Sequence, residues 1–325
     1  MQIIGLILLL FAFTFVLIKS ADLTLESLKS LARKLKIESF AISAIILAVA
    51  TSLPELFVGI TSAFGGSPDL SLGNILGANI ANLSLVVGLS TLIAGGVVIH
   101  QKVIFKEILL AGGAAVLPLV LMYDGVLGRT DGAILSAIYL AYATSFFKIR
   151  FQQIGNTLFN GRFMLRFVRH VEETEQRVDR TLGHLFVGIA ALLFSANFIV
   201  KLSRDLAGLT GISIFIIGII FLSIGTTLPE LVISLESLKR KEPGVFLANV
   251  LGSLIVNSTL ILGIVSLISP IKGIAVDNYL IPLIFFVIVF ALFRLFTRTK
   301  LKLDRWEGLI LVLIYMVFVV IEFIH

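Results

Sequence analysis

The sequence predicts an all-α integral membrane protein with ten transmembrane helices, arranged as two inverted five-helix repeats with broken helices at the membrane midplane. Three observations lead to this fold class. The composition is too apolar for a soluble protein, a phrase that contains a glutamate recurs at a constant offset, and basic residues alternate in abundance between successive loops.

The composition indicates a polytopic membrane protein. Hydrophobic residues make up 58% of the chain and charged residues 14%, and the mean hydropathy is +1.07. Soluble globular chains are about 45–50% apolar and about 25% charged. The chain has no cysteine, which excludes disulfides, thiol catalysis and cysteine-ligated metal centres. The formal net charge of +6 indicates loops that face anionic lipid, and no nucleic-acid partner is expected.

The spans follow from the length of the apolar runs, because a bilayer-crossing helix needs about 20 mostly apolar residues. The ten predicted spans are roughly 1–19, 39–63, 70–96, 103–122, 130–147, 183–203, 212–236, 245–269, 278–297 and 306–324. The first run has no basic residues before it, so we interpret it as a retained helix, not a signal peptide. We expect the segment from Ser20 to Lys36 to continue it as a tilted or interfacial helix.

The basic residues predict the sidedness of the spans. If the N-terminus is outside, all but four of the 26 Lys and Arg residues fall in inside loops or at inner helix ends. The four on the outside are Arg129, Lys201, Arg204 and Lys272. The positive-inside rule therefore predicts that the N- and C-termini are both outside. Short loops favour a prokaryotic plasma membrane as the location.

The spans divide into two repeats of five. The first covers residues 1–147 with its most similar core at about 44–90, and the second covers 182–325 with its core at about 219–265. An odd number of spans in each repeat places the second copy upside down relative to the first. Residues 148–181 form a polar inside linker of mixed charge. We expect a solvated connector that touches lipid headgroups, with a regulatory ion site as the alternative.

Each repeat carries a glutamate directly after a proline within an apolar run. The phrases are Thr51-Ser52-Leu53-Pro54-Glu55 and Thr226-Thr227-Leu228-Pro229-Glu230, separated by 175 residues without a gap. Proline removes the amide that bonds four residues back, so the helix opens and carbonyl groups lose their partners. The glutamate then begins a half-helix whose dipole helps to keep it ionised. Carboxylates, freed carbonyls and the hydroxyls of Thr51, Ser52, Thr226 and Thr227 give an all-oxygen set that calcium and sodium prefer.

The next helix of each repeat supplies amides. Two series have a spacing of four residues and so lie along one helix face each: Asn74, Ala78 and Asn82, and Asn249, Ser253 and Asn257. Gly73 and Gly77, like Ala248 and Gly252, provide small surfaces for close helix packing. Inverted repeats would bring Glu55, Asn82, Glu230 and Asn257 together at the midplane, where such transporters bind substrate.

Each of these features can also occur for ordinary structural reasons. A proline can simply kink a helix, small residues can simply pack, and an asparagine can bond two helices together. A single glutamate could also pair with a basic residue, but no Lys or Arg lies near either acid within its broken helix. The duplication of the whole combination at a constant offset favours an ion site. Glu236 is interpreted differently, as an interfacial partner of Arg240 four residues later.

At these residues the chain resembles the cation/calcium exchanger superfamily, in particular prokaryotic sodium/calcium exchangers. The resemblance rests on the two proline-glutamate phrases together with Gly73–Asn82 and Ala248–Asn257, which are similar to the two alpha repeats of that family. It implies a secondary antiporter that exchanges sodium for calcium by alternating access and uses no cofactor. It also implies a monomer as the functional unit and a sliding motion of the first and sixth helices.

The resemblance further implies four overlapping cation sites. Glu55 and Glu230 would be the shared calcium ligands, with the carbonyls of Thr51 and Thr226. Sodium would use the same glutamates together with Ser52, Thr227, Ser253 and the carbonyls near Ala48 and Ser223, and Asn82 and Asn257 would complete the centre. Ala78 departs from the serine that is frequent in the family, which bears on sodium stoichiometry. Asn257 stands where many microbial members carry aspartate and where potassium-dependent relatives also carry an acid. Because Asn82 and Asn257 are both neutral, potassium dependence is not expected.

Three other functions remain as alternatives. A proton/calcium or other cation/proton exchanger on the same fold could use the glutamates as proton carriers, although further acids or histidines are absent from the asparagine-bearing helices. A passive channel would not need paired helix breaks at a deep site. An intramembrane enzyme is not supported, because the chain has no HExxH motif, paired catalytic aspartates or convincing Ser/His pair.

Overall fold

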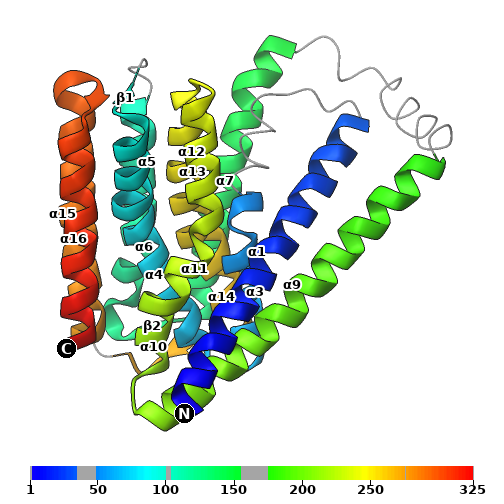
Figure 1. Ribbon diagram of the computed structural model, residues 1–325, viewed down its shortest axis with the longest axis vertical. Coiled ribbons are helices and arrows are strands. Elements are labelled where there is room, and N and C mark those ends of the chain that lie inside the picture. The colour runs from blue at the N-terminus through cyan, green and yellow to red at the C-terminus, as the bar shows by residue number, and fades with distance from the viewer. Residues whose placement is uncertain (1, 35–48, 100–103, 155–174, 275, 325) are drawn as a thin grey trace.

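The computed structural model describes residues 2–34, 49–99, 104–154, 175–274 and 276–324. Within these ranges the chain is a bundle of long helices beside a tilted helix pair (Figure 1). Eight helical segments of the described residues are long and apolar enough to cross a membrane. The chain is therefore a multi-pass membrane protein, as the composition predicts.

The helices of the first half follow the expected order. They are α1 (Gln2–Lys34), α3 (Leu53–Phe64), α4 (Pro68–Ala81), η1 (Asn82–Val86), α5 (Val87–Ala94), α6 (Ile104–Leu121), η2 (Met122–Asp124) and α7 (Arg129–Ile154). Helix α1 continues without interruption to Lys34, which confirms the expected extension beyond residue 20. The segments α4, η1 and α5 form one span, residues 68–94.

The second half repeats this order. Its helices are α9 (Glu175–Thr210), α10 (Ile214–Ile217), η3 (Gly218–Leu222), α11 (Ser223–Thr226), α12 (Leu228–Lys239), α13 (Pro243–Ile255), η4 (Val256–Ile261), α14 (Leu262–Ile268), α15 (Val276–Lys300) and α16 (Arg305–Ile324). Residues 148–154 and 175–181, expected to belong to the polar linker, are helical extensions of α7 and α9.

Two of the ten expected spans are not among the eight. The span 39–63 contains α3, a twelve-residue apolar helix, but residues 35–48 lie outside the described ranges. The span 130–147 coincides with α7, whose side chains are described only as far as Thr144. The count of ten therefore stays a prediction.

Helices α1 and α9 run side by side and lean away from the other helices (Figure 1). The pair is held by aromatic and small side chains. The rings of Phe13 and Phe198 stack with centroids 4.6 Å apart. Gly188 allows α9 to approach Thr24 so closely that an added Cβ would lie 2.4 Å from its hydroxyl oxygen. The two helices thus form one packed unit.

Short strand pairs close both ends of the bundle. Strand β1 (Val97–Val98) pairs antiparallel with β4 (Lys302–Leu303), and β2 (Val126–Leu127) pairs antiparallel with β3 (Ile271–Lys272). The first pair lies at the end opposite the two termini and the second at the end that carries them (Figure 1). Each pair joins one strand from each half of the chain.

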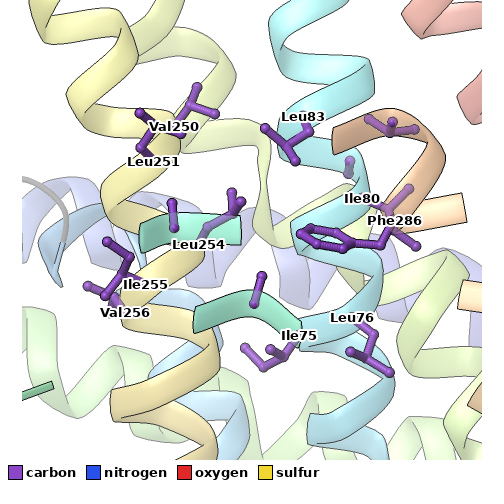
Figure 2. Packing of buried hydrophobic residues seen from close by; sticks show 14 of the residues in the cluster. Ile75, Leu76, Ile80, Leu83, Val250, Leu251, Leu254, Ile255, Val256 and Phe286 are labelled. Atoms are coloured by element: carbon purple, nitrogen blue, oxygen red, sulfur yellow. The ribbon is translucent and has the colours of Figure 1, made fainter. Parts of the chain in front are cut away.

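The core that supports the centre of the bundle is a large cluster of buried apolar side chains. Figure 2 shows part of it, carried by α13 and η4 on one side and by α4 and η1 on the other. Phe286 of α15 joins this cluster from a third direction. The helices that bear the asparagine series are therefore its most deeply buried members.

Candidate cation site

The two proline-glutamate phrases interrupt their helices in the same way. Ser52, before α3, has φ −84° and ψ 13°, and Thr227, before α12, has φ −83° and ψ −2°. Helical bonding resumes from these residues, with Leu56 N to Ser52 O at 3.0 Å and Leu231 N to Thr227 O at 3.1 Å. The expected break in each helix is confirmed, and each glutamate lies in the first turn after it.

The two glutamates are fully buried and lack basic partners. Glu55 and Glu230 are each 0% exposed, and no ion pair among the described residues involves either of them. Both carboxylate oxygens of Glu55 and the Oε2 atom of Glu230 have no hydrogen-bond partner. Burial of an unpaired charge is costly, so the pair needs a cation or protons.

Hydroxyl groups link the two acids across the two halves of the chain. Ser253 Oγ donates to Glu230 Oε1 at 3.3 Å, and Ser253 Oγ lies 3.3 Å from Thr51 Oγ1. The Thr226 hydroxyl lies beside the Glu55 carboxylate and donates to Asn74 Oδ1 at 3.1 Å. The structure thus brings predicted residues of both repeats to one place.

The asparagine series divides into bonded and unbonded members. Asn249 Nδ2 donates to Glu230 O at 3.2 Å and to Ser234 Oγ at 3.3 Å, so it secures α13 to α12. Asn257 Nδ2 donates to Asn79 Oδ1 at 3.4 Å and leaves its own Oδ1 without a partner. Asn82 is 0% exposed, and neither of its side-chain atoms has a partner.

The unpartnered oxygens form a set suited to a hard cation. They include Ser52 Oγ, Glu55 Oε1, Glu55 Oε2, Glu230 Oε2, Asn82 Oδ1 and Asn257 Oδ1, all in buried residues. Buried polar atoms normally have partners, and leaving one unsatisfied costs about 1–3 kcal/mol. Carboxylate, amide and hydroxyl oxygens are ligands of calcium and sodium. The donor set therefore fits such an ion.

Two further predicted ligands, Thr227 and Ser223, form hydrogen bonds within their own helix next to the break. Thr227 Oγ1 donates to Ser223 O at 2.8 Å, so the two groups are adjacent, and the hydroxyl oxygen of Thr227 keeps lone pairs for a cation. Ser223 Oγ donates to Ile219 O at 2.5 Å. Ala48 lies outside the described residues.

Three π-helical turns lie at the site, and the sequence did not predict them. Two start at or just before an asparagine of the site: η1 at Asn82 and η4 at Val256. The third, η3, directly precedes Ser223. A hydroxyl bonds the carbonyl four residues back at each turn: Ser84 to Ile80 O at 2.5 Å, Thr259 to Ile255 O at 2.6 Å, and Ser223 to Ile219 O. These bonds satisfy carbonyls that a wider turn releases, and π-turns are frequent at functional sites.

Glycines set the distance between α4 and the broken helix of the other repeat. A Cβ atom on Gly73 would lie 2.2 Å from Phe215 O, and one on Gly77 would lie 2.2 Å from Ile219 O. A Cβ atom on Gly218 would in turn lie 2.5 Å from Leu70 O of α4. The expected close packing is confirmed for Gly73 and Gly77, and its partner is the second broken helix; for Ala248 and Gly252 it stays a prediction.

Two polar residues of the site were missed by sequence reasoning. Asn79 Nδ2 donates to Ser258 Oγ at 2.7 Å, and both residues are fully or almost fully buried. At an offset of 175 residues, Asn79 corresponds to Leu254 and Ser258 to Leu83. A search for polar residues repeated in both halves could not find this hydrogen bond, because each of its two residues corresponds to a leucine in the other half.

Comparisons with known proteins match this chain over most of its length. The model of the family described as "Sodium/calcium exchanger protein" matches residues 5–148 and again residues 181–324. The sodium/calcium exchanger MaX1 of Methanosarcina acetivorans is 26% identical, over 94% of this chain and 95% of that protein. The putative antiporter CaxA of Alkalimonas amylolytica is 30% identical over 78% of each chain.

A solved structure has a similar fold. The sodium-calcium exchanger NCX_Mj, soaked with 2.5 mM Na⁺ and 0.1 mM Ca²⁺, superposes with a TM-score of 0.62 and 26% sequence identity. The match covers 98% of this chain and 97% of that one. The inner membrane protein YrbG of Escherichia coli is a further relative, 28% identical over 77% of this chain and 76% of its own length.

Proposed function

The chain belongs to the sodium/calcium exchanger protein family, and from that premise we propose that it exchanges sodium for calcium across the membrane by alternating access. The observation that carries the proposal is the pair of fully buried glutamates, Glu55 and Glu230, on two helix breaks of the same geometry. Their unpartnered oxygens supply two negative charges without any basic neighbour among the described residues. Calcium would neutralise both charges.

The proposed ligand sets use the oxygens of the site. Calcium takes the carboxylates of Glu55 and Glu230 with the carbonyls of Thr51 and Thr226. Sodium takes the same carboxylates with Ser52, Thr227, Ser253 and the carbonyls of Ala48 and Ser223, while Asn82 and Asn257 face the centre. The unbonded amide oxygens of Asn82 and Asn257 support this arrangement.

The coupling between the two ions follows from the charge of the site. Two carboxylates without a cation form a doubly negative centre, which resists enclosure in a low-dielectric environment. A bound calcium ion, or several sodium ions, removes that penalty and permits occlusion. Only a loaded carrier then changes state, which is the differential stabilisation that alternating access requires. Sodium that enters down its gradient can therefore drive calcium out.

We also propose that the two halves form inverted repeats, residues 1–147 and 182–325, joined by the inside segment 148–181. The family model matches the chain twice, and each end of the bundle is closed by a strand pair with one member from each half. Close glycine contacts recur in equivalent places of the two halves. A Cβ atom on Gly88 would lie 2.7 Å from Gly308 O, and one on Gly132 would lie 2.8 Å from Gly263 O.

The proposed orientation places both termini outside a plasma membrane. The described N- and C-terminal ends lie at the same end of the bundle (Figure 1), and the strand pair β1–β4 with its basic neighbours lies at the other. The packed pair α1 and α9 is the unit that would slide against the remaining helices, with lipid around it. We propose the monomer as the functional unit, because side chains of both halves contact each other at the site within one chain.

The test is calcium-45 uptake into proteoliposomes preloaded with sodium, compared with liposomes preloaded with choline at equal pH. We expect uptake only with internal sodium, and its loss in Glu55→Gln and Glu230→Gln. Glu236→Gln is the matched control, because Glu236 lies on the same helix as Glu230 but forms an exposed ion pair with Arg240. Unaltered calcium flux in either site variant would refute the site. Uptake that needs a pH gradient instead of sodium would assign the protein to the proton-coupled alternative.

A further inference from the structure

Tyr315 of α16 places an unpaired hydroxyl group inside the bundle. The residue is 2% exposed, and its Oη atom has no hydrogen-bond partner of normal geometry. Helix α16 packs against η3, which Ser223 directly follows, and the Ser223 side chain lies near this hydroxyl. The ring is held by Phe318, with centroids 6.1 Å apart. A buried hydroxyl without a partner is unfavourable, so a partner is expected in some state of the protein.

Ser223 connects that hydroxyl to the candidate cation site. Its Oγ donates to Ile219 O at 2.5 Å and keeps lone pairs that can accept another hydrogen. Its carbonyl accepts from Thr227 N at 3.1 Å and from Thr227 Oγ1 at 2.8 Å, next to the helix break. On the opposite side the side chain meets Gly77, where an added Cβ would lie 2.6 Å from Oγ. Ser223 is thus held between α4 and α16.

A second repeated phrase marks the same position in the first half of the chain. Residues 127–139, LGRTDGAILSAIY, correspond to residues 303–315, LDRWEGLILVLIY, at an offset of 176. The structure supports this alignment through equivalent turns, with Gly128 N donating to Asp131 Oδ2 and Asp304 N to Glu307 Oε2, each at 2.8 Å. Both phrases end in a buried tyrosine, Tyr139 and Tyr315.

The two tyrosines differ in the partner that the sequence offers them. At the offset of the helix breaks, Ser223 corresponds to Ala48, which has no hydroxyl. A chain of hydroxyl groups from the last helix of a repeat toward the break can therefore exist only in the second half.

We propose that Tyr315 is a positioning residue for sodium, which acts by donating a hydrogen bond to the Ser223 hydroxyl when the site is loaded. The chain Tyr315 Oη to Ser223 Oγ to Ile219 O would fix turn η3 and hold the Ser223 carbonyl toward the ion. This inference rests on the proposed function, in which the Ser223 carbonyl binds sodium and not calcium. Tyr315 therefore affects the affinity for sodium and leaves that for calcium nearly unchanged.

The experiment compares Tyr315→Phe with the wild-type protein in two measurements. The first is the sodium dependence of calcium uptake in proteoliposomes, and the second is the shift of the melting temperature of purified protein with sodium or calcium. We expect the sodium concentration for half-maximal effect to rise by about two- to tenfold, the range of one lost hydrogen bond. The calcium concentration for half-maximal effect should change by less than about twofold.

Three further variants separate positioning from general stability. Tyr279→Phe removes a buried hydroxyl group that donates to Met122 O, with a hydrogen-bond length of 3.2 Å, in another part of the bundle. This variant should lower the melting temperature without altering the sodium dependence of uptake. Tyr139→Phe should likewise leave sodium dependence unchanged. Ser223→Ala should weaken sodium binding, and Tyr315→Phe should add nothing to it in the double variant, since both act on one interaction.

Each outcome decides the matter. An active wild type with an unchanged sodium dependence in Tyr315→Phe overturns the inference and leaves the proposed function intact. The same holds if calcium and sodium affinities fall equally, or if Tyr315→Phe has its full effect without the Ser223 hydroxyl. A wild type without sodium-dependent uptake and without a sodium-induced melting shift overturns the proposed function itself, and the inference with it.

Discussion

The contact between Gly77 and the broken helix of the second half gives the sharpest prediction. In Gly77→Ala, the new Cβ would lie 2.2 Å from Ile219 O and 2.6 Å from Ser223 Oγ. Ordinary van der Waals contact begins near 3.4 Å, so α4 and η3 must separate by more than 1 Å. A backbone carbonyl cannot rotate out of the way as a flexible side chain does. The strain must therefore displace a helix.

The displacement should affect both stability and ion binding. Overpacking of a close contact destabilises a protein by about 1–3 kcal/mol. Gly77 lies one turn from Asn74, whose Oδ1 accepts a hydrogen bond from Thr226 at 3.1 Å, beside the Glu55 carboxylate. A shift of about 1 Å at a site can reduce activity by up to about a hundredfold. We expect the apparent calcium affinity to fall by about ten- to a hundredfold.

The assay combines the melting temperature of purified protein with calcium uptake in proteoliposomes. Gly113→Ala is the matched control, because α6 leaves no atom within 4 Å of the added Cβ. It should keep wild-type transport and a melting temperature that is unchanged or slightly higher, since alanine favours helix. If Gly77→Ala melts and transports like the wild type, the close approach of α4 to η3 is not what holds the site.

Two further predictions concern single residues of the asparagine-bearing helices. Ala78→Ser adds a hydroxyl group at a fully buried position and should raise the affinity for sodium or steepen the sodium dependence of calcium uptake. An unchanged sodium dependence would show that residue 78 does not face a sodium ion. Asn79→Leu removes the partner of Ser258 and Asn257 and should lower the melting temperature, because each group left buried and unpaired costs about 1–3 kcal/mol of stability. Ser258→Ala in that background should restore part of the loss. An unchanged melting temperature in Asn79→Leu would contradict the assigned bridge.

The acids of the site could be found from the sequence because their pattern is local and repeated. A proline fixes where a helix opens, and a glutamate next to it in an apolar run is costly unless it binds a cation or a proton. The gapless offset of 175 residues connects Glu55 to Glu230 on the sequence alone. The break at Ser52 and Thr227 and the burial of both acids then follow as expected.

The remaining parts of the site depend on contacts that one sequence does not encode locally. A π-turn has no composition of its own, so Asn82 and Val256 gave no sign that η1 and η4 begin there. Glycine spacing indicated close packing but not that Gly77 meets Ile219 of the other half. Tyr315 was hidden because the offset changes from 175 to 176 between the two repeated phrases.

The differences between the two copies bear on which ion each half can serve. Calcium ligands proposed here occur in both halves, because Glu55 and Thr51 correspond to Glu230 and Thr226. Among the residues proposed to bind sodium, two carry a hydroxyl group in the second half only. Ser223 corresponds to Ala48 and Ser253 to Ala78.

The proposed calcium site takes its ligands from both halves and is therefore unaffected by this asymmetry, whereas the proposed sodium sites are affected by it. Sodium should bind more tightly beside α11 and α13, where Ser253 already contacts Glu230 and Thr51. On this reasoning, the number of sodium ions exchanged can change by substitution at the alanine positions without loss of the calcium site. In the proposed mechanism, the repeat would preserve the two negative charges that couple the ions, while the sodium ligands could vary.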